Sequence, residues 1–224
     1  MKINFKLDME KDFENYYEAV NDKKRYSLWT KSISQKILKL IGGKSKDEAY
    51  QNVLPILKLN YNIYEKYFNI FLKQVEEYWQ EVGSKFTERF ENLTGNKFSF
   101  DEVTVYLTTI QRCPYNYGEK WFMISFLEHP LSAVKIICHE LMHFHFIDNN
   151  WNNIEKEIGK EKTDNLKEAL TVLLNLEFKD LLFFEDRGYE EHKKLREFIK
   201  IEWEKEKDYD KLIHKCILFL ENEN

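Results

Sequence analysis

The chain has 224 residues and a formal net charge of −5, with 34 lysines and arginines set against 39 aspartates and glutamates. This length allows one compact domain or two lobes, and it is ample for a sizeable core. The opposite charges are interspersed along the chain, and neither a basic tract nor a glycine-rich phosphate loop occurs, so nucleic acid and nucleotides are not expected partners.

Three features bear on the cellular compartment: the first residues, the length of the apolar runs and the cysteines. The first ten residues lack the apolar core of a signal peptide, and no run of 18 apolar residues occurs, so we expect no membrane span. The three cysteines, Cys113, Cys138 and Cys216, are odd in number and widely spaced, which favours neither a disulfide framework nor a zinc finger. We therefore expect a cytoplasmic protein.

The spacing of apolar residues in the N-terminal part, residues 1–95, predicts helices and no strand. Its first clear helical face contains apolar residues at helical spacing: Trp29, Ile33, Ile37, Leu40 and Ile41. Gly42 is expected to end that helix, and Pro55 to break the next apolar stretch and start another that runs to Gly83. Ser84 is expected to cap a shorter helix that Gly95 closes.

A small sheet is expected next. Residues 102–109 alternate strictly, with Val103, Val105 and Leu107 on one face, which is typical of a strand with one buried face. Residues 120–126 form a second β-rich run, and residues 112–118 between the two have loop chemistry.

The sequence His139-Glu140-Leu141-Met142-His143 follows, inside a run that predicts a helix. Residues four apart on a helix are offset by about 40°, so both imidazoles point from one face and can hold one Zn²⁺. Glu140 is rotated by about 100° from His139, where it can accept a proton from a metal-activated water without being a ligand. The pattern H-E-x-x-H therefore predicts a zinc hydrolase site.

The alternative interpretation is that His139 and His143 are ordinary helix residues, and the residues around them argue against it. Residues 131–147 are apolar on nearly every side, which is typical of a buried helix. Buried histidines and a buried glutamate are costly unless they are paired or bind a metal.

A catalytic zinc needs a third protein ligand, and Glu168 is our candidate. It lies on the polar edge of a second apolar helix, expected at residues 164–175, which a polar connection at 155–163 separates from the first. A solvated glutamate in the first turn of a helix is the alternative interpretation. His145 is rejected as a ligand, because two residues from His143 it points to another helix face.

These residues resemble the gluzincin metallopeptidases, the thermolysin-like class, over roughly residues 100–200. The resemblance implies that His139, His143 and Glu168 are zinc ligands and that Glu140 is the general base. Many gluzincins have an acid four residues after the ligand glutamate, which orients a histidine ligand. Val172 occupies that position here, so another group, such as Thr171, Asn175 or a backbone carbonyl, must take that role.

The resemblance also implies a substrate-binding edge strand and an oxyanion donor. Residues 121–126, just ahead of the zinc helix, are our candidate for the edge strand, to which a substrate adds as a further strand; a plain sheet strand is the alternative. Beyond the ligand glutamate, a turn at Gly188 can aim Tyr189 or His192 into the cleft as the donor. Ordinary packing of Tyr189 and a surface position for His192 are the alternatives.

The expected fold is α+β and mostly helical, with a thermolysin-like core. Residues 1–95 form a helical lobe, residues 96–148 the small sheet and zinc helix, and residues 149–224 a helical lobe that carries the third ligand and ends in helices near 189–206 and 209–222. The expected function is a zinc-dependent peptidase that acts on peptides or proteins with one Zn²⁺ per chain. The alternative is a catalytically silent zinc-binding scaffold or regulatory protein.

Overall fold

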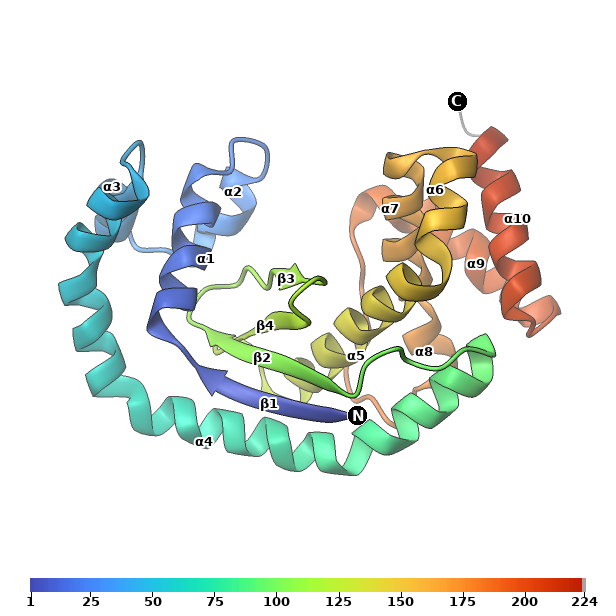
Figure 1. Cartoon of the computed structure of the whole chain (residues 1–224), viewed down its shortest axis with the longest axis horizontal. Helices are drawn as coiled ribbons and strands as arrows, with labels where there is room; N and C mark the ends of the chain where they lie inside the picture. Colours follow the sequence, from blue (N-terminus) through green and yellow to red (C-terminus); the bar gives the residue numbers. More distant parts are fainter. Residues whose placement is uncertain (223–224) are drawn as a thin grey trace. The chain divides into compact units, whose positions relative to one another are not determined.

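The computed structural model describes residues 1–222 and divides the chain into two compact units (Figure 1). The sheet unit comprises Lys2–Tyr78 and Glu102–Ala133, and the helical unit comprises Met1, Trp79–Asp101 and the chain from Val134 onwards. Helices account for 68% of the described residues and the sheet has four strands, which confirms the α+β expectation at a coarse level. The units differ from the expected boundaries, because the sheet groups with the N-terminal helices.

The sheet has the strand order β1-β2-β4-β3, and Figure 1 shows the strands side by side. Its three longer strands are parallel to one another: β1 (Lys2–Leu7), β2 (Glu102–Thr108) and β4 (Trp121–Ser125). The two β-rich runs of the sequence are thus confirmed as strands, and Val103, Val105 and Leu107 are buried. The expectation of helices alone at the N-terminus is wrong, because β1 pairs with β2 along its whole length.

Strand β4 is not the free edge that we expected. The two-residue strand β3 (Tyr115–Asn116) pairs antiparallel with its first half, and the Met123 N–H donates to the Pro114 carbonyl at 2.9 Å. The backbone after Pro114 is extended, so the segment with loop chemistry adds a short strand. The outer strands of the sheet are therefore β1 and β3.

In the sheet unit, the long helix α4 is preceded by α1 (Met9–Asn21), α2 (Tyr26–Trp29), a 3₁₀ turn (Thr30–Ser32) and α3 (Gln35–Ile41), and α4 itself continues into the helical unit. Asp8 caps α1 by accepting from the backbone N–H groups of Glu10 and Lys11. The expected end of α3 at Gly42 is confirmed. The core of these elements contains large apolar side chains: Phe13, Tyr16, Val20, Ile33, Ile37, Ile41, Val53, Leu57 and Ile110.

Helix α4 (Lys46–Thr94) runs without a break through Pro55 and Gly83, so both expected interruptions are wrong. A Cβ at Gly83 would lie 2.5 Å from the Trp79 indole, so this glycine makes room for a buried side chain rather than ending the helix. The expected stop at Gly95 is confirmed, and its φ of +70° is a conformation that glycine adopts at low cost.

The helical unit contains most of α5, which begins in the sheet unit, and then a series of shorter helices. They are α5 (Pro130–Phe146), a π-helical turn (Ile147–Trp151), α6 (Asn152–Ile158), α7 (Lys160–Leu170), α8 (Leu173–Glu177), a 3₁₀ turn (Glu190–His192), α9 (Lys193–Lys205) and α10 (Tyr209–Asn222). The last two confirm the expected terminal helices. The expected polar connection at 155–163 is wrong, because it is helical except at Gly159, whose φ is +81°.

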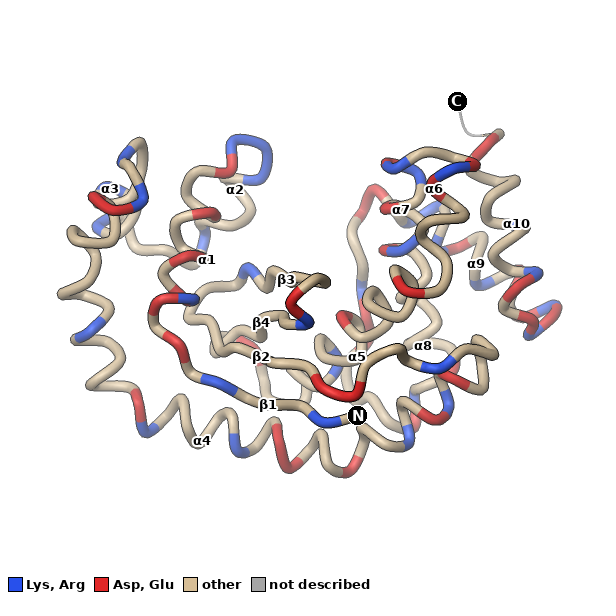
Figure 2. Tube along the Cα trace, in the orientation of Figure 1, with Lys and Arg blue, Asp and Glu red and all other residues tan. Residues whose placement is uncertain are grey.

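Among residues 1–222, no helix combines the length and the apolar character that a membrane crossing requires. Figure 2 shows the lysines and arginines interspersed with the acids along the trace of both units, as the sequence predicts.

Candidate metal centre

Helix α5 places the two histidines of the H-E-x-x-H motif on one face. The ring centroids of His139 and His143 lie 4.3 Å apart. Neighbouring residues on the other faces, such as Ile137, Cys138 and Leu141, are completely buried, which agrees with the apolar sequence of this helix. The helix is therefore held on nearly every side, and its orientation fixes both imidazoles.

Glu168, from the last turn of α7, faces this histidine pair. Its Oε1 lies 3.3 Å from His143 Nε2, and its Oε2 lies 3.8 Å from His139 Nε2. One ligand atom from each of the three residues lies within 4.8 Å of the other two, and no other such group of histidine, cysteine or acidic residues occurs within residues 1–222. The structure thus brings together the three predicted ligands, although Glu168 lies at the end of its helix and not in the first turn.

His139 is oriented by a residue that the sequence analysis did not identify. Its Nδ1 lies 2.7 Å from Oδ2 of Asp186, a buried acid in the loop after α8. Thr171 donates to Asp186 Oδ1 at 3.0 Å, and Asn175 exchanges two hydrogen bonds with the Asp186 backbone, at 2.7 and 2.8 Å. Thr171 and Asn175, which we considered in place of Val172, therefore contribute by holding the acid that contacts the histidine.

Arg196 of α9 completes this support. Its guanidinium lies 3.1 Å from Asp186 Oδ1 and donates to the Asp186 carbonyl at 2.6 Å and to Thr171 Oγ1 at 2.8 Å. Gly188, with a φ of +62°, lets the loop pass so close to this side chain that a Cβ would lie 2.8 Å from the Arg196 Cζ. The loop conformation that presents Asp186 to His139 therefore requires a glycine at this position.

The two histidines differ in charge preference. Burial disfavours the charged form of His139, but the adjacent Asp186 carboxylate outweighs burial and raises the pKa of His139 to about 9. Burial, together with the positive charge of His139, lowers the pKa of His143 to about 4. His143 is thus neutral at neutral pH, the form in which an imidazole binds a metal.

Glu140 is a buried acid with one open oxygen. Burial raises the pKa of its carboxyl to about 7, against the opposing charge of His139. Within the described part of the chain, Glu140 Oε2 is buried and has no hydrogen-bond partner. Burial alone would also raise the pKa of Glu168, but the neighbouring His143, Lys167 and His139 lower it well below its usual range. Two acids beside one histidine pair thus have opposite proton affinities, as an acid–base site requires.

Tyr189, His192 and His145, the other residues considered for the site, lie in different surroundings. His192 is buried, its Nε2 lies 3.3 Å from Asn165 Oδ1, and its ring packs against that of Tyr189, which is 38% exposed. Burial lowers the pKa of His192, and the nearby Glu168 carboxylate opposes that shift. His145 contacts Thr94 Oγ1 at 3.2 Å, away from the ligand group.

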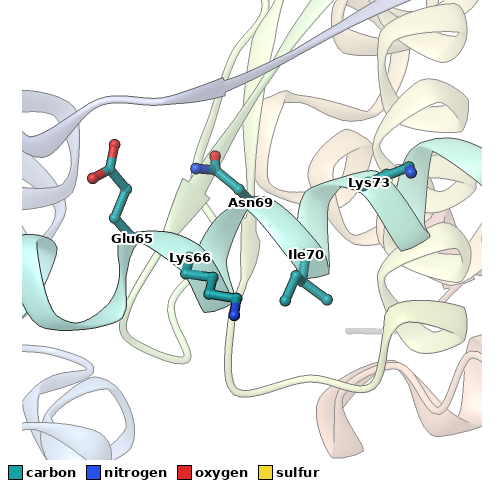
Figure 3. Close-up of a pocket in the computed structure, with 5 residues that line it drawn as sticks. All are labelled: Glu65, Lys66, Asn69, Ile70 and Lys73. Carbon is teal, nitrogen blue, oxygen red and sulfur yellow. The ribbon is translucent and has the colours of Figure 1, made fainter.

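A surface pocket in the sheet unit offers no comparable chemistry. Figure 3 shows that its lining comes from one face of α4, and the lining residues are Glu65, Lys66, Asn69, Ile70 and Lys73. It contains neither a histidine nor a cysteine. The group around His139 in the helical unit is therefore the better candidate for a functional site.

The residues fit a divalent metal. Two imidazoles and one carboxylate are the donor set of many catalytic zinc sites, and the open oxygen of Glu140 is a buried acceptor without another use. Comparisons with known proteins gave no match to a family model, to a curated protein or to a solved structure. The resemblance to gluzincins therefore rests on the four site residues.

Proposed function

We propose that this protein is a zinc-dependent metallopeptidase whose core is arranged as in gluzincins. The proposal is supported most strongly by one observation: Glu140, with a buried oxygen that has no hydrogen-bond partner among the described residues, follows directly after the first residue of a His139–His143–Glu168 ligand group. A structural zinc site has no use for a base at this position. In this proposal α5 is the active-site helix, and α7 carries the third ligand.

The three ligand residues hold the metal, and Glu140 moves the protons. Zinc, when bound, supplies a Lewis acid that polarises the scissile carbonyl and lowers the pKa of the attacking water. Glu140 Oε2 accepts the proton of that water and passes it to the leaving amine. In the metal-free protein, burial raises the pKa of Glu140 to about 7, and a proton affinity near neutrality suits a group that accepts and returns a proton.

Asp186 fixes the ring of His139 in this proposal. The contact of 2.7 Å with His139 Nδ1 leaves Nε2 as the atom that faces Glu168. Without metal the His139 ring is protonated at neutral pH, and a metal at Nε2 would displace that proton. The contact with Asp186 would then keep the remaining proton on Nδ1 and fix the orientation of the ring. Thr171, Asn175 and Arg196 keep the acid in place.

Tyr189 and His192 are the candidates for the donor that stabilises the developing negative charge on the substrate carbonyl oxygen. Both belong to the segment after Asp186, and Glu168 is close enough to His192 to influence its pKa. Tyr189→Phe is expected to lower kcat with little change in KM or zinc content, because the hydroxyl acts mainly in the transition state. An unchanged kcat in Tyr189→Phe together with a collapse in His192→Ala assigns the role to the histidine, and no effect in either variant excludes both.

The proposed function is tested by metal analysis and peptide cleavage on the same samples. We expect about one zinc per chain, by the three-ligand rule for catalytic sites, and cleavage of a random peptide library by the wild-type protein. Glu140→Gln should retain zinc and fold but lose cleavage by about 10²–10⁴-fold. Wild-type cleavage rates in Glu140→Gln contradict the proposed mechanism, and stoichiometric zinc without cleavage by the wild-type protein supports the scaffold alternative.

A further inference from the structure

A buried lysine lies beside the third ligand. The side chain of Lys167, on α7, is 2% exposed, and its Nζ lies 3.1 Å from Glu168 Oε1 and 2.9 Å from Asp164 Oδ1. Lysine is among the residues that are least often fully buried, and when it is buried it is paired. This ammonium is paired with two carboxylates, and one of them is a candidate metal ligand.

The contact uses the Glu168 oxygen that faces His143, and the other oxygen, Oε2, faces His139. Glu168 Oε1 lies 3.3 Å from His143 Nε2 and 3.1 Å from the Lys167 ammonium. A divalent cation bound by His143 and Glu168 would therefore share a carboxylate with a fixed positive charge. Two cations that share one carboxylate in a buried site repel one another, and each weakens the attraction of the carboxylate for the other.

Resting on the proposed function, we propose that Lys167 is a positioning residue that competes with zinc for Glu168. Without metal, its ammonium neutralises the buried Glu168 carboxylate and holds it opposite the histidines. With metal, the same charge lowers the affinity of the site and withdraws electron density from the ligand oxygen. The site therefore exchanges its metal more readily than its three ligands alone would allow.

Asp164 controls how strongly Lys167 acts on Glu168. Its carboxylate is 53% exposed, so solvent stabilises it without help from the lysine. When zinc occupies the site, the ammonium keeps Asp164 as its second partner and remains satisfied in its buried position. If Asp164 loses its charge, Glu168 is the one of these two carboxylates that still neutralises Lys167. Lys167 then competes more strongly with zinc for Glu168.

The test measures zinc affinity by competition with a chromophoric chelator, on the full-length protein. Lys167→Met, which keeps the apolar stem and removes the charge, should bind zinc about tenfold more tightly, and Asp164→Asn about threefold more weakly, as the direction of the Coulomb interaction requires. Lys167→Arg keeps the charge and should stay close to the wild type. Lys160→Met removes an exposed lysine from the same helix and serves as the matched control.

The outcomes separate this inference from the proposed function. If the wild-type protein binds no zinc, both are overturned. If it binds zinc through His139 and His143 but Lys167→Met binds equally or more weakly, the competition is wrong while the metal site remains. A supporting lysine without competition would give a loss of about 10–100-fold, the usual effect of removing a group that orients a ligand. Should Lys167→Met fail to fold, Asp164→Asn decides alone, because its affected side chain is half exposed: weaker zinc binding supports the competition, and unchanged or tighter binding overturns it.

Discussion

Asp12 in the sheet unit and Glu140 in the helical unit are both buried acids, and they differ in their hydrogen bonds. Asp12 Oδ1 accepts from Thr108 Oγ1 at 2.7 Å and from the Thr109 N–H at 2.9 Å. Its Oδ2 accepts from Thr109 Oγ1 at 2.7 Å and from the Tyr61 hydroxyl at 3.1 Å. Glu140 Oε2 has no such partner among the described residues.

Burial alone does not distinguish the two acids; their hydrogen bonds do. Burial raises the pKa of both carboxyls, and at Asp12 the hydrogen bonds oppose that shift. The four donors tie α1 to the end of β2 and to α4, so Asp12 has a structural use. Glu140 carries the cost of burial without that compensation, which is typical of a group kept for a reaction.

The largest effect on zinc binding is expected at the histidines. They too include residues that face the proposed metal, His139 and His143, and one whose ring is engaged in hydrogen bonds elsewhere, His145. His143→Ala, like His139→Ala, should abolish stoichiometric zinc binding, because two ligands do not make a stable site. His145→Ala is the matched control two residues further along α5, since His145 Nε2 is engaged with Thr94 and with the Asn96 carbonyl at 3.0 Å. Isothermal titration with zinc checks both, and loss of binding in His145→Ala would contradict the assignment.

The stability of the two acid variants tests the comparison directly. Asp12→Asn should lower the free energy of unfolding by about 3 kcal/mol, because an amide loses hydrogen bonds to a charged acceptor and leaves buried donors unsatisfied. Urea unfolding measures this loss, and Glu10→Gln, at an exposed acid in the same helix, controls for charge. If the Asp12→Asn protein is as stable as the Glu10→Gln protein, Asp12 has no structural role.

Glu140→Gln should behave in the opposite way in the metal-free protein. The pKa of Glu140 rises from its ordinary value of 4.5 to about 7 in the folded state, so the folded protein binds the proton more tightly than the unfolded chain. Its contribution to stability therefore falls as pH rises between those two values. At pH 8 Glu140→Gln should be as stable as the wild type or more so, and wild-type stability should decline over this pH range more than that of the variant.

The sequence predicted the elements with a strong local pattern. The alternation in β2, the apolar helix around His139 and the glycine that ends α4 follow from residues within one turn or one strand. The strand β1 was missed because its six residues gain most of their stability from pairing with β2, about a hundred residues later. Pro55 and Gly83 were misread because tertiary packing overrides the cost of a breaker within a long helix.

For the site, the sequence predicted the groups joined by a motif and missed those joined only by the fold. His139, Glu140 and His143 share one helix, and Glu168 follows as the third ligand that such a site needs. Asp186 and Lys167 carry no such signal, because an acid in a loop and a lysine on a helix are usually solvated. Their positions become visible only when distant segments are brought together.

A smaller effect on zinc binding is expected at Asp186, a buried acid that contacts His139, and it is compared with the nearby exposed acid Asp180. Asp186→Asn should weaken zinc binding by about 10–100-fold, the usual effect of removing a partner that orients a histidine ligand. Asp180→Asn is the matched control, because Asp180 lies in the same connection but is exposed and paired with Arg89. Equal zinc affinities in the two variants would show that His139 needs no help from Asp186.

The smallest effect on zinc binding is expected at Gly188. It is compared with Gly95, a second glycine with a similar backbone angle. Gly95 has a φ of +70°, and a Cβ added there would have no neighbouring atom within 4 Å, so Gly95→Ala measures the backbone cost alone, about 1–2 kcal/mol. Gly188→Ala adds a methyl group 2.8 Å from the Arg196 Cζ, so Arg196 must shift and release part of its hold on Asp186. We expect a loss of stability of about 1–2 kcal/mol from the conformation, and in addition a weakening of zinc binding that Gly95→Ala does not show. Thermal unfolding and zinc titration of the two variants separate strain in the backbone from displacement of the acid that orients His139.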